Sequence, residues 1–246
     1  VRDSAYSLKK VPSRFRDWSY HSFRNYNIDD FVMAAESLAE RGYHVFRMGV
    51  VVEKPLNSKN KRIIDYANTD LRSDFMDIYL GAKCFFCIST DYGFQDLPCL
   101  FGKPLVQMGV PLGNLFSYNE KFLLMTKHHF FKKEKRKLSL SEIFSHGVAY
   151  SYYTRDFEQK EIDLIENSPE EIKDLAIEMV EKLESKRILN IEDKKLQEKF
   201  RNLYASNIKR YNYKKVSESL SHITMHGQIK SSFSTKFLRE NKNWLK

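Results

Sequence analysis

The sequence predicts an α/β protein: a Rossmann-like, mostly parallel sheet with flanking helices, followed by a helical C-terminal segment. Short apolar segments with the composition of strands alternate with segments of helical periodicity over the first 150 residues, which is the pattern of a doubly wound sheet. Residues 84–88 form a continuous apolar run, as expected of a central strand that helices cover on both faces. After residue 168, helical periodicity replaces the alternation.

The first helix and strand are expected between residues 27 and 50. Asn27 is a suitable N-cap, apolar residues then recur with a 3.6-residue period as far as Ala39, and Gly42 suits the C′ position. Residues 43–50 have the composition of a strand. A second unit follows, in which the apolar patch 63–64 precedes Ser73, the expected cap of a helix over 74–81.

Further elements are predicted along the chain by the same signals. Strands are expected at 84–88, 105–108 and 122–125, with a helical stretch over 94–101. Ser168 and Glu171 form a capping box with Pro169 at N1, so a long amphipathic helix is expected to begin there. A second helical stretch is expected over 194–221. We therefore expect a sheet domain over 1–150 and a helical extension over 151–246 that packs on it.

Composition restricts the class of protein. With 246 residues, 42% of them apolar, the chain can bury a sizeable core. No run of about 18 apolar residues is present, so we expect a cytoplasmic protein. The net charge of +9 suits a polyanion, an anionic membrane surface or a phosphate pocket. Much of the excess lies in one segment, which is either a solvated loop or a peripheral contact with lipid headgroups at the inner face of the membrane: Lys132, Lys133, Lys135, Arg136 and Lys137.

The three cysteines predict buried thiols in a reducing compartment. Cys84 and Cys87 form a lone C-x-x-C, and residues three apart in a strand point to opposite faces. A structural zinc site would also need a second pair of ligands. We therefore expect no metal.

Three polar clusters follow predicted strands, and ligands of open α/β sheets bind beyond the carboxyl ends of the strands. The clusters are Arg2-Asp3, Arg47-Met48-Gly49 and Ser89-Thr90-Asp91-Tyr92-Gly93. The small hydroxyl residues of the third would let a diphosphate approach backbone amides, although Ser89 or Thr90 could instead cap the next helix. The two arginines could neutralise phosphate or form ordinary surface ion pairs.

Other polar residues have two interpretations each. Asp74 and Asp77 could belong to a site or simply complement a helix dipole. Glu142 is a candidate ribose ligand, but Ser139 and Glu142 also form a capping box. The run Lys127-His128-His129 could touch an acceptor or a phosphate, whereas surface histidines are the plainer interpretation.

Several segments together resemble a family of bacterial glycosyltransferases with the two-domain GT-B architecture, distantly similar to the fucosyltransferase superfamily. The resemblance covers most of residues 1–150 and the C-terminal tail. It is carried by Val1-Arg2-Asp3, which is similar to the end of an H-x-R-D-type motif, by residues 44–49 and 72–77, by Cys87-Ile88-Ser89-Thr90, by Phe101-Gly102-Lys103-Pro104, and by residues 236–238 with Trp244-Leu245.

The resemblance implies that the chain is the donor-binding half of a glycosyltransferase, with an N-terminal GT-B domain expected upstream of Val1. Such an enzyme would transfer a sugar from a nucleotide diphosphate to a cell-surface glycan or glycolipid precursor, without a metal or other cofactor. Arg2 would bind or activate the donor diphosphate, Ser89 and Thr90 would meet phosphate, and Arg47 and Gly49 would line the base or ribose. Asp3 is the candidate catalytic base. The donor-binding set is Arg2, Arg47, Gly49, Asp74, Ser89, Thr90, Asp91, Gly93 and Glu142.

Two other functions agree with the same residues. A non-catalytic module could bind a nucleotide sugar or a glycan. A basic nucleic-acid-binding protein would account for the charge and the aromatic residues, but the aromatics lie mostly within apolar patterns instead of alternating with Lys and Arg.

Overall fold

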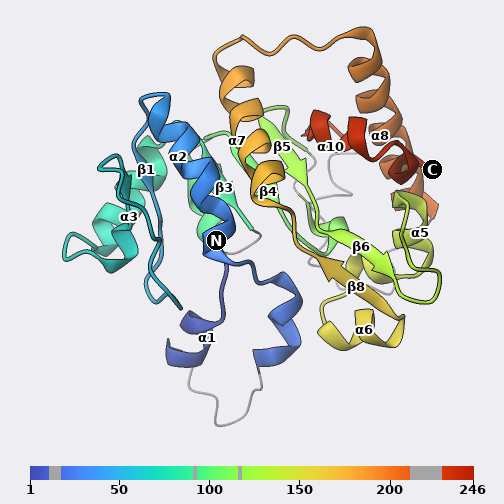
Figure 1. Cartoon of the computed structure of the whole chain (residues 1–246), viewed down its shortest axis with the longest axis horizontal. Coiled ribbons are helices and arrows are strands. Elements are labelled where there is room, and N and C mark those ends of the chain that lie inside the picture. The colour runs from blue at the N-terminus through green and yellow to red at the C-terminus, as the bar shows by residue number, and fades with distance from the viewer. Residues whose placement is uncertain (11–17, 91–92, 116–117, 211–228) are drawn as a thin grey trace.

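The computed structural model describes residues 1–10, 18–90, 93–115, 118–210 and 229–246. Within these ranges the chain is mixed α/β and contains a parallel sheet of four strands (Figure 1). Its strands are β3 (Cys87–Ser89), β4 (Leu105–Met108), β5 (Phe122–Met125) and β9 (Ser232–Phe233), in the order β3-β4-β5-β9. The predicted strands 105–108 and 122–125 are confirmed to the residue, and the predicted strand 84–88 is shifted toward Ser89.

A pair of parallel strands stands apart from that sheet. Strand β1 (Val45–Phe46) pairs only with β2 (Ile63–Ile64) in the described residues, with Val45 opposite Ile63. Before β1 come α1 (Ala5–Lys10), η1 (Trp18–Arg24), η2 (Ile28–Phe31) and α2 (Val32–Glu40). The predicted cap is confirmed, because the Asn27 side chain accepts a hydrogen bond from the Asp29 amide at 3.2 Å. Gly42, just beyond α2, has a positive φ of 94°.

Short helices lie between the successive strands from β2 to β5. After η3 (Tyr66–Asn68), Ser73 caps α3 (Asp74–Lys83) by accepting a hydrogen bond from the Met76 amide, as predicted. Next come η4 (Gly93–Gln95) and α4 (Asp96–Leu100), which agree with the predicted helical stretch, and η5 (Leu112–Asn114) follows β4.

A three-stranded antiparallel sheet in the order β7-β6-β8 was not anticipated from the sequence. Its strands are β6 (His128–Phe131), β7 (Arg136–Lys137) and β8 (Ile162–Ile165). Between β7 and β8 the chain forms α5 (Leu140–Ser145), η6 (Val148–Tyr150) and α6 (Thr154–Gln159). The prediction of a helical extension is wrong for residues 162–165, because they pair with β6 along its whole length. Cross-strand packing decides this sheet, and it joins residues far apart in sequence, such as Phe131 with Ile162 and His128 with Ile165.

The C-terminal part contains α7 (Pro169–Leu183), α8 (Ile191–Arg210), α10 (Thr235–Glu240) and η9 (Lys242–Leu245). The capping box before α7 is confirmed, with hydrogen bonds in both directions between Ser168 and Glu171. The predicted helix over 194–221 is described as far as Arg210, and the rest lies outside the described residues. Strand β9 extends the parallel sheet beside β5, so the extension over 151–246 is not purely helical.

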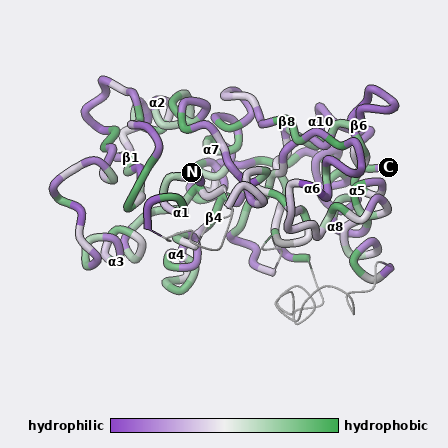
Figure 2. Tube along the Cα trace, turned by 90° about the horizontal axis from the view of Figure 1, so that it is seen from below, coloured by the Kyte–Doolittle hydropathy of each residue, from purple (hydrophilic) through white to green (hydrophobic). Residues whose placement is uncertain are grey.

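The core is centred on the parallel sheet. All four residues of β4 and all four of β5 are buried, and helix α7 packs against β4 with α2 beside it (Figure 1). Figure 2 shows apolar segments of the chain near β4 and hydrophilic segments in the peripheral loops. The central strands thus form a rigid base from which the loops at their carboxyl ends project.

Candidate functional site

The N-terminal segment joins two of the predicted polar clusters at the carboxyl ends of β1 and β3. The backbone amide of Arg2 donates a 2.7 Å hydrogen bond to Oγ1 of Thr90, which follows β3. The carboxylate of Asp3 lies 3.9 Å from the guanidinium of Arg47, which follows β1. The three clusters that the strand-end rule singled out therefore meet in space.

Two cations converge on the backbone and side chain of Asn25. The guanidinium of Arg2 donates to Oδ1 of Asn25 and, at 3.1 Å, to the carbonyl of His21. Nζ of Lys127, just beyond β5, donates at 2.5 Å to the Asn25 carbonyl and lies 4.2 Å from the centre of the Tyr26 ring. Burial lowers the pKa of Lys127, the carboxylate of Glu166 raises it, and the positive charge of Arg2 adds to the lowering.

Ser89 and Thr90 are fully buried at the end of β3. Neither is the N-cap of the following helix α4, because its N-cap position is Gln95. Thr90 accepts the Arg2 amide, whereas Oγ of Ser89 has no hydrogen-bond partner in the described part of the chain. Gly93 opens the next 3₁₀ turn, and Asp91 lies outside the described residues. A buried hydroxyl without a partner costs free energy unless a ligand or water supplies one.

Arg47 is held in an ion-pair network instead of facing open solvent. It is 6% exposed, and it donates to Oδ1 of Asp65 at 2.9 Å and to the Lys54 carbonyl at 3.1 Å. Asp65 also accepts the amide of Leu56 at 3.0 Å. The guanidinium thus fastens the loop after β1, which agrees with the ion-pair interpretation, although the pair is buried instead of lying on the surface.

Asp3 and Gly49 also have local structural roles. The two carboxylate oxygens of Asp3 accept the amides of Ala5, at 2.9 Å, and of Glu53, at 3.1 Å. A Cβ added at Gly49 would lie 2.8 Å from Cγ1 of Val52, so a larger residue there would force the Val52 side chain to shift.

Asp74 and Glu142, two of the expected donor ligands, are not brought to this cluster. The Asp74 side chain is 97% exposed in the first turn of α3, where it pairs with Arg72 at 3.3 Å. Glu142 completes the capping box of α5 and accepts two hydrogen bonds from Arg136, at 2.9 and 2.6 Å, which hold its pKa down at about 2. Figure 1 shows α3 and α5 on opposite sides of β3. Local helix capping accounts for both residues.

The two histidines after Lys127 are buried, so their interpretation as surface residues was wrong. Nε2 of His128 lies 2.9 Å from Oε1 of Glu171, and its ring stacks on Phe237. His129 is 2% exposed, and Nδ1 lies 3.0 Å from the carbonyl of Lys127. Both belong to β6, whose pairing turns them into the interior.

The basic segment forms the exposed hairpin between β6 and β7. Two of its cations are paired: Lys132 with Asp163 at 2.8 Å, and Arg136 with Glu134 and Glu142, each at 2.6 Å. The other three residues, Lys133, Lys135 and Lys137, are exposed. The charge available for an anionic partner is thus smaller than the sequence count indicates.

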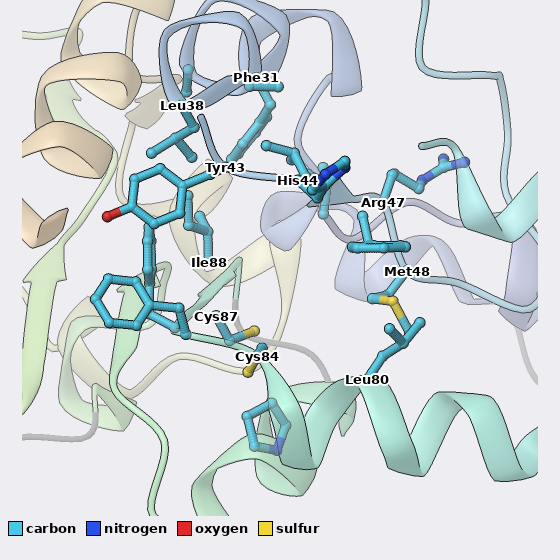
Figure 3. Close-up of a pocket in the computed structure, with 18 of the residues that line it drawn as sticks. Phe31, Leu38, Tyr43, His44, Arg47, Met48, Leu80, Cys84, Cys87 and Ile88 are labelled. Atoms are coloured by element: carbon cyan, nitrogen blue, oxygen red, sulfur yellow. The ribbon is translucent and has the colours of Figure 1, made fainter. Parts of the chain in front are cut away.

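The cysteines are free thiols, and two of them line one cavity. Cys84 and Cys87 contribute to a cavity of about 360 Å³ between β1 and β3, and Figure 3 shows their sulfur atoms near one another. The expectation that they face opposite ways was wrong, because Cys84 is the C-cap residue of α3 and not part of the strand. Burial raises the pKa of Cys87 to about 12, which keeps the thiol protonated.

Comparison with family models, with curated proteins and with solved structures finds no match for this chain. No cluster of three potential metal ligands occurs among the residues that the structure describes. In those same ranges, no helix combines the length and the apolar character needed to cross a bilayer.

The sequence did not point to every residue of the cluster. Asn25, which binds both cations, lies in a segment with no periodic pattern. Lys127 was among the sequence candidates, because the run Lys127-His128-His129 follows the predicted strand 122–125 and could touch a phosphate. Asn25 contacts Arg2 across 23 residues of sequence, and Lys127 contacts Asn25 across 102 residues. Local sequence patterns do not reveal contacts of this range.

Proposed function

We propose that the carboxyl edge of the parallel strands binds the diphosphate of a nucleotide sugar, and that the chain is the Rossmann-like donor half of a glycosyltransferase. The acceptor would be a cell-surface glycan or glycolipid precursor. The parallel order β3-β4-β5-β9 and the separate parallel pair β1-β2 agree with this architecture.

One observation carries the proposal: two cations and two small hydroxyl residues meet at the end of the sheet. Arg2 and Lys127 both bind Asn25, and the Arg2 amide binds Thr90, next to the unpartnered hydroxyl of Ser89. A guanidinium and an ammonium would neutralise phosphate oxygens, and the Ser89 hydroxyl would donate a hydrogen bond.

The same groups can lower the barrier to sugar transfer. When the bond between the sugar and the diphosphate breaks, negative charge develops on the departing phosphate. Arg2 is held by Asn25, and Lys127 by Asn25 and by Glu166 at 3.5 Å, so both positive groups are in place before that charge develops. A metal ion is not required by this scheme, and the expectation of metal-independent transfer stays a prediction.

A non-catalytic donor-binding module is the second candidate, and the surroundings of Asp3 favour it. Both carboxylate oxygens already accept backbone amides, and Arg47 lies 3.9 Å away. A general base must reach the acceptor hydroxyl and take its proton. Asp3 is therefore poorly placed for that step, and we propose no base within this chain.

Isothermal titration calorimetry with nucleoside diphosphates tests the proposal. We expect one of them to bind, and we expect Arg2→Gln and Lys127→Gln each to weaken binding by roughly tenfold, because each removes a charge-assisted hydrogen bond to phosphate. Arg2→Lys keeps the charge and should lose less affinity than Arg2→Gln.

Lys133→Gln is the matched control, since it removes one exposed positive charge from the β6–β7 hairpin. Its affinity should equal that of the unmodified chain. Thermal unfolding of each variant separates lost binding from lost folding. The proposal would be contradicted by an absence of binding to every nucleoside diphosphate, or by an equal loss in Lys133→Gln, which would indicate attraction by net charge alone.

A further inference from the structure

The cavity between β1 and β3 separates two parallel sheets. Residues 43–48 line one side and residues 83–88 the other, while α2 contributes apolar side chains such as Leu38. Figure 3 shows Leu38, Tyr43 and Ile88 around the cavity. Among the described strands, β1 pairs only with β2, and β3 pairs only with β4. Each of the two strands therefore has an unpaired edge beside the cavity.

Contacts at both ends of the cavity show that β1 and β3 run in the same direction. Just before the two strands, the rings of Tyr43 and Phe85 stack with centroids 5.6 Å apart. Just after them, Arg47 and Thr90 both contact the segment Arg2-Asp3. The two strands thus keep the common direction found in the parallel pairs on either side.

The unpaired edges present backbone polar groups to the cavity. The amides of Val45 and Arg47 bond to the carbonyls of Arg62 and Ile64 in the β2 segment. Because successive residues of a strand direct their backbone groups to opposite edges, those of Phe46 point the other way. The amide of Cys87 likewise bonds to Pro104, which turns the backbone of Ile88 toward the cavity. Phe46 is 39% exposed and Ile88 is half-buried, so both edges are open to pairing with an added strand.

We propose that this cavity is a strand site: it accepts an extended apolar polypeptide segment, parallel to β1 and β3, that leads into Val1. Val1 itself lines the cavity, and the neighbouring Arg2 amide bonds to Thr90 at the carboxyl end. A segment leading into Val1 therefore runs in the direction of both neighbours. It would join the two sheets into one, in the order β2-β1-segment-β3-β4-β5-β9.

A polypeptide strand fits this cavity better than a lipid or another apolar ligand. Such ligands would fill the volume but offer no backbone partners to Phe46 and Ile88, whereas an added strand would. Six residues line each side of the cavity. At a rise of roughly 3.3 Å per residue, that length accommodates an inserted strand of about five residues.

The test adds a segment to Val1. One variant carries a five-residue extension rich in Val and Ile, and its matched control carries a Gly/Ser extension of the same length. We expect the apolar extension to raise the melting temperature by roughly 5 °C and the Gly/Ser extension to leave it unchanged. Alkylation of Cys84 and Cys87 by a small maleimide, followed by mass spectrometry, should become about tenfold slower with the apolar extension. Cys99, which does not line the cavity, is the internal reference.

Two further variants keep the result interpretable. A proline at the centre of the apolar extension removes a backbone donor and should abolish the protection. Ala35→Phe fills the cavity from α2 and should make the apolar and Gly/Ser extensions equivalent. Equal alkylation rates for both extensions in the parent chain, or protection that survives proline or Ala35→Phe, would overturn the strand site.

Discussion

At the scale of single residues, burial controls the ionisation of the groups around β6. His129 is 2% exposed, and burial lowers its pKa from 6.5 to about 3. The ring is held by the carbonyl of Lys127 at Nδ1, and Nε2 has no partner within the described ranges. The folded protein therefore holds this histidine neutral, next to a lysine that belongs to the candidate site.

A pH dependence of stability follows from His129. Between pH 6.5 and 3 the unfolded chain binds a proton that the folded chain excludes, so stability falls as pH falls through this window. From pH 7.5 to 5.5 this group should remove about 1.4 kcal/mol from the free energy of unfolding. Urea unfolding of the parent chain and of His129→Phe at both pH values measures the difference.

His44→Phe is the matched control, because His44 is exposed. This variant should leave the pH dependence of stability unchanged. A parent chain and His129→Phe with the same slope between pH 7.5 and 5.5 would show that His129 does not titrate as inferred.

At the scale of elements, one carboxylate holds α7 against the start of α10. Glu178 of α7 accepts the amide and the hydroxyl of Thr235, at 2.9 and 2.6 Å, and pairs with Arg187 at 2.5 Å. An acid at a helix N-terminus also complements the helix dipole. Burial raises the pKa of Glu178, while the positive charge of Arg187 opposes that rise.

Removal of this charge should destabilise the protein. Glu178→Gln leaves the largely buried guanidinium of Arg187 without its carboxylate partner, and we expect the free energy of unfolding to fall by about 3 kcal/mol. Urea unfolding at pH 7 measures it. Glu198→Gln, on the exposed side of α8, is the control and should change stability by less than about 0.5 kcal/mol. Similar losses in both variants would argue against this ion pair as a link between the helices.

At the scale of the whole molecule, the C-terminal tail completes the core of the sheet. Phe233 of β9 is fully buried, and its ring centroid lies 4.9 Å from that of Phe200 and 4.8 Å from that of Trp244. Gln197 of α8 bonds to both the amide and the carbonyl of Phe233, at 3.0 and 2.7 Å. The tail therefore packs between the sheet and α8 and is hydrogen-bonded to both.

Truncation of this ring should therefore affect the entire fold. Phe233→Ala removes a large buried side chain, and we expect a loss of about 3 to 5 kcal/mol of stability. Phe75→Ala is the control, because Phe75 is 71% exposed on α3. Chemical unfolding followed by circular dichroism compares the two. A small loss for Phe233→Ala would show that the tail is an appendage and not part of the core.

The candidate site was partly predictable. The rule that ligands bind beyond the carboxyl ends of strands selected Arg2, Arg47 and Thr90, and these residues do meet. The same rule could not show that Arg47 is occupied by Asp65, or that Asn25 ties Arg2 to Lys127. Those facts depend on which loops lie side by side.

The elements whose signals are local could be predicted from the amino-acid sequence alone. Ser139 and Ser168 cap their helices through hydrogen bonds that span three residues, and the apolar runs 105–108 and 122–125 form strands. Long-range contacts, in contrast, make His128 the start of a buried strand, bring Phe233 into the parallel sheet, and join Arg2 to Thr90. The physical reason is range: a cap or an apolar run is satisfied by neighbours in sequence, whereas strand pairing and buried ion pairs depend on partners that folding brings together.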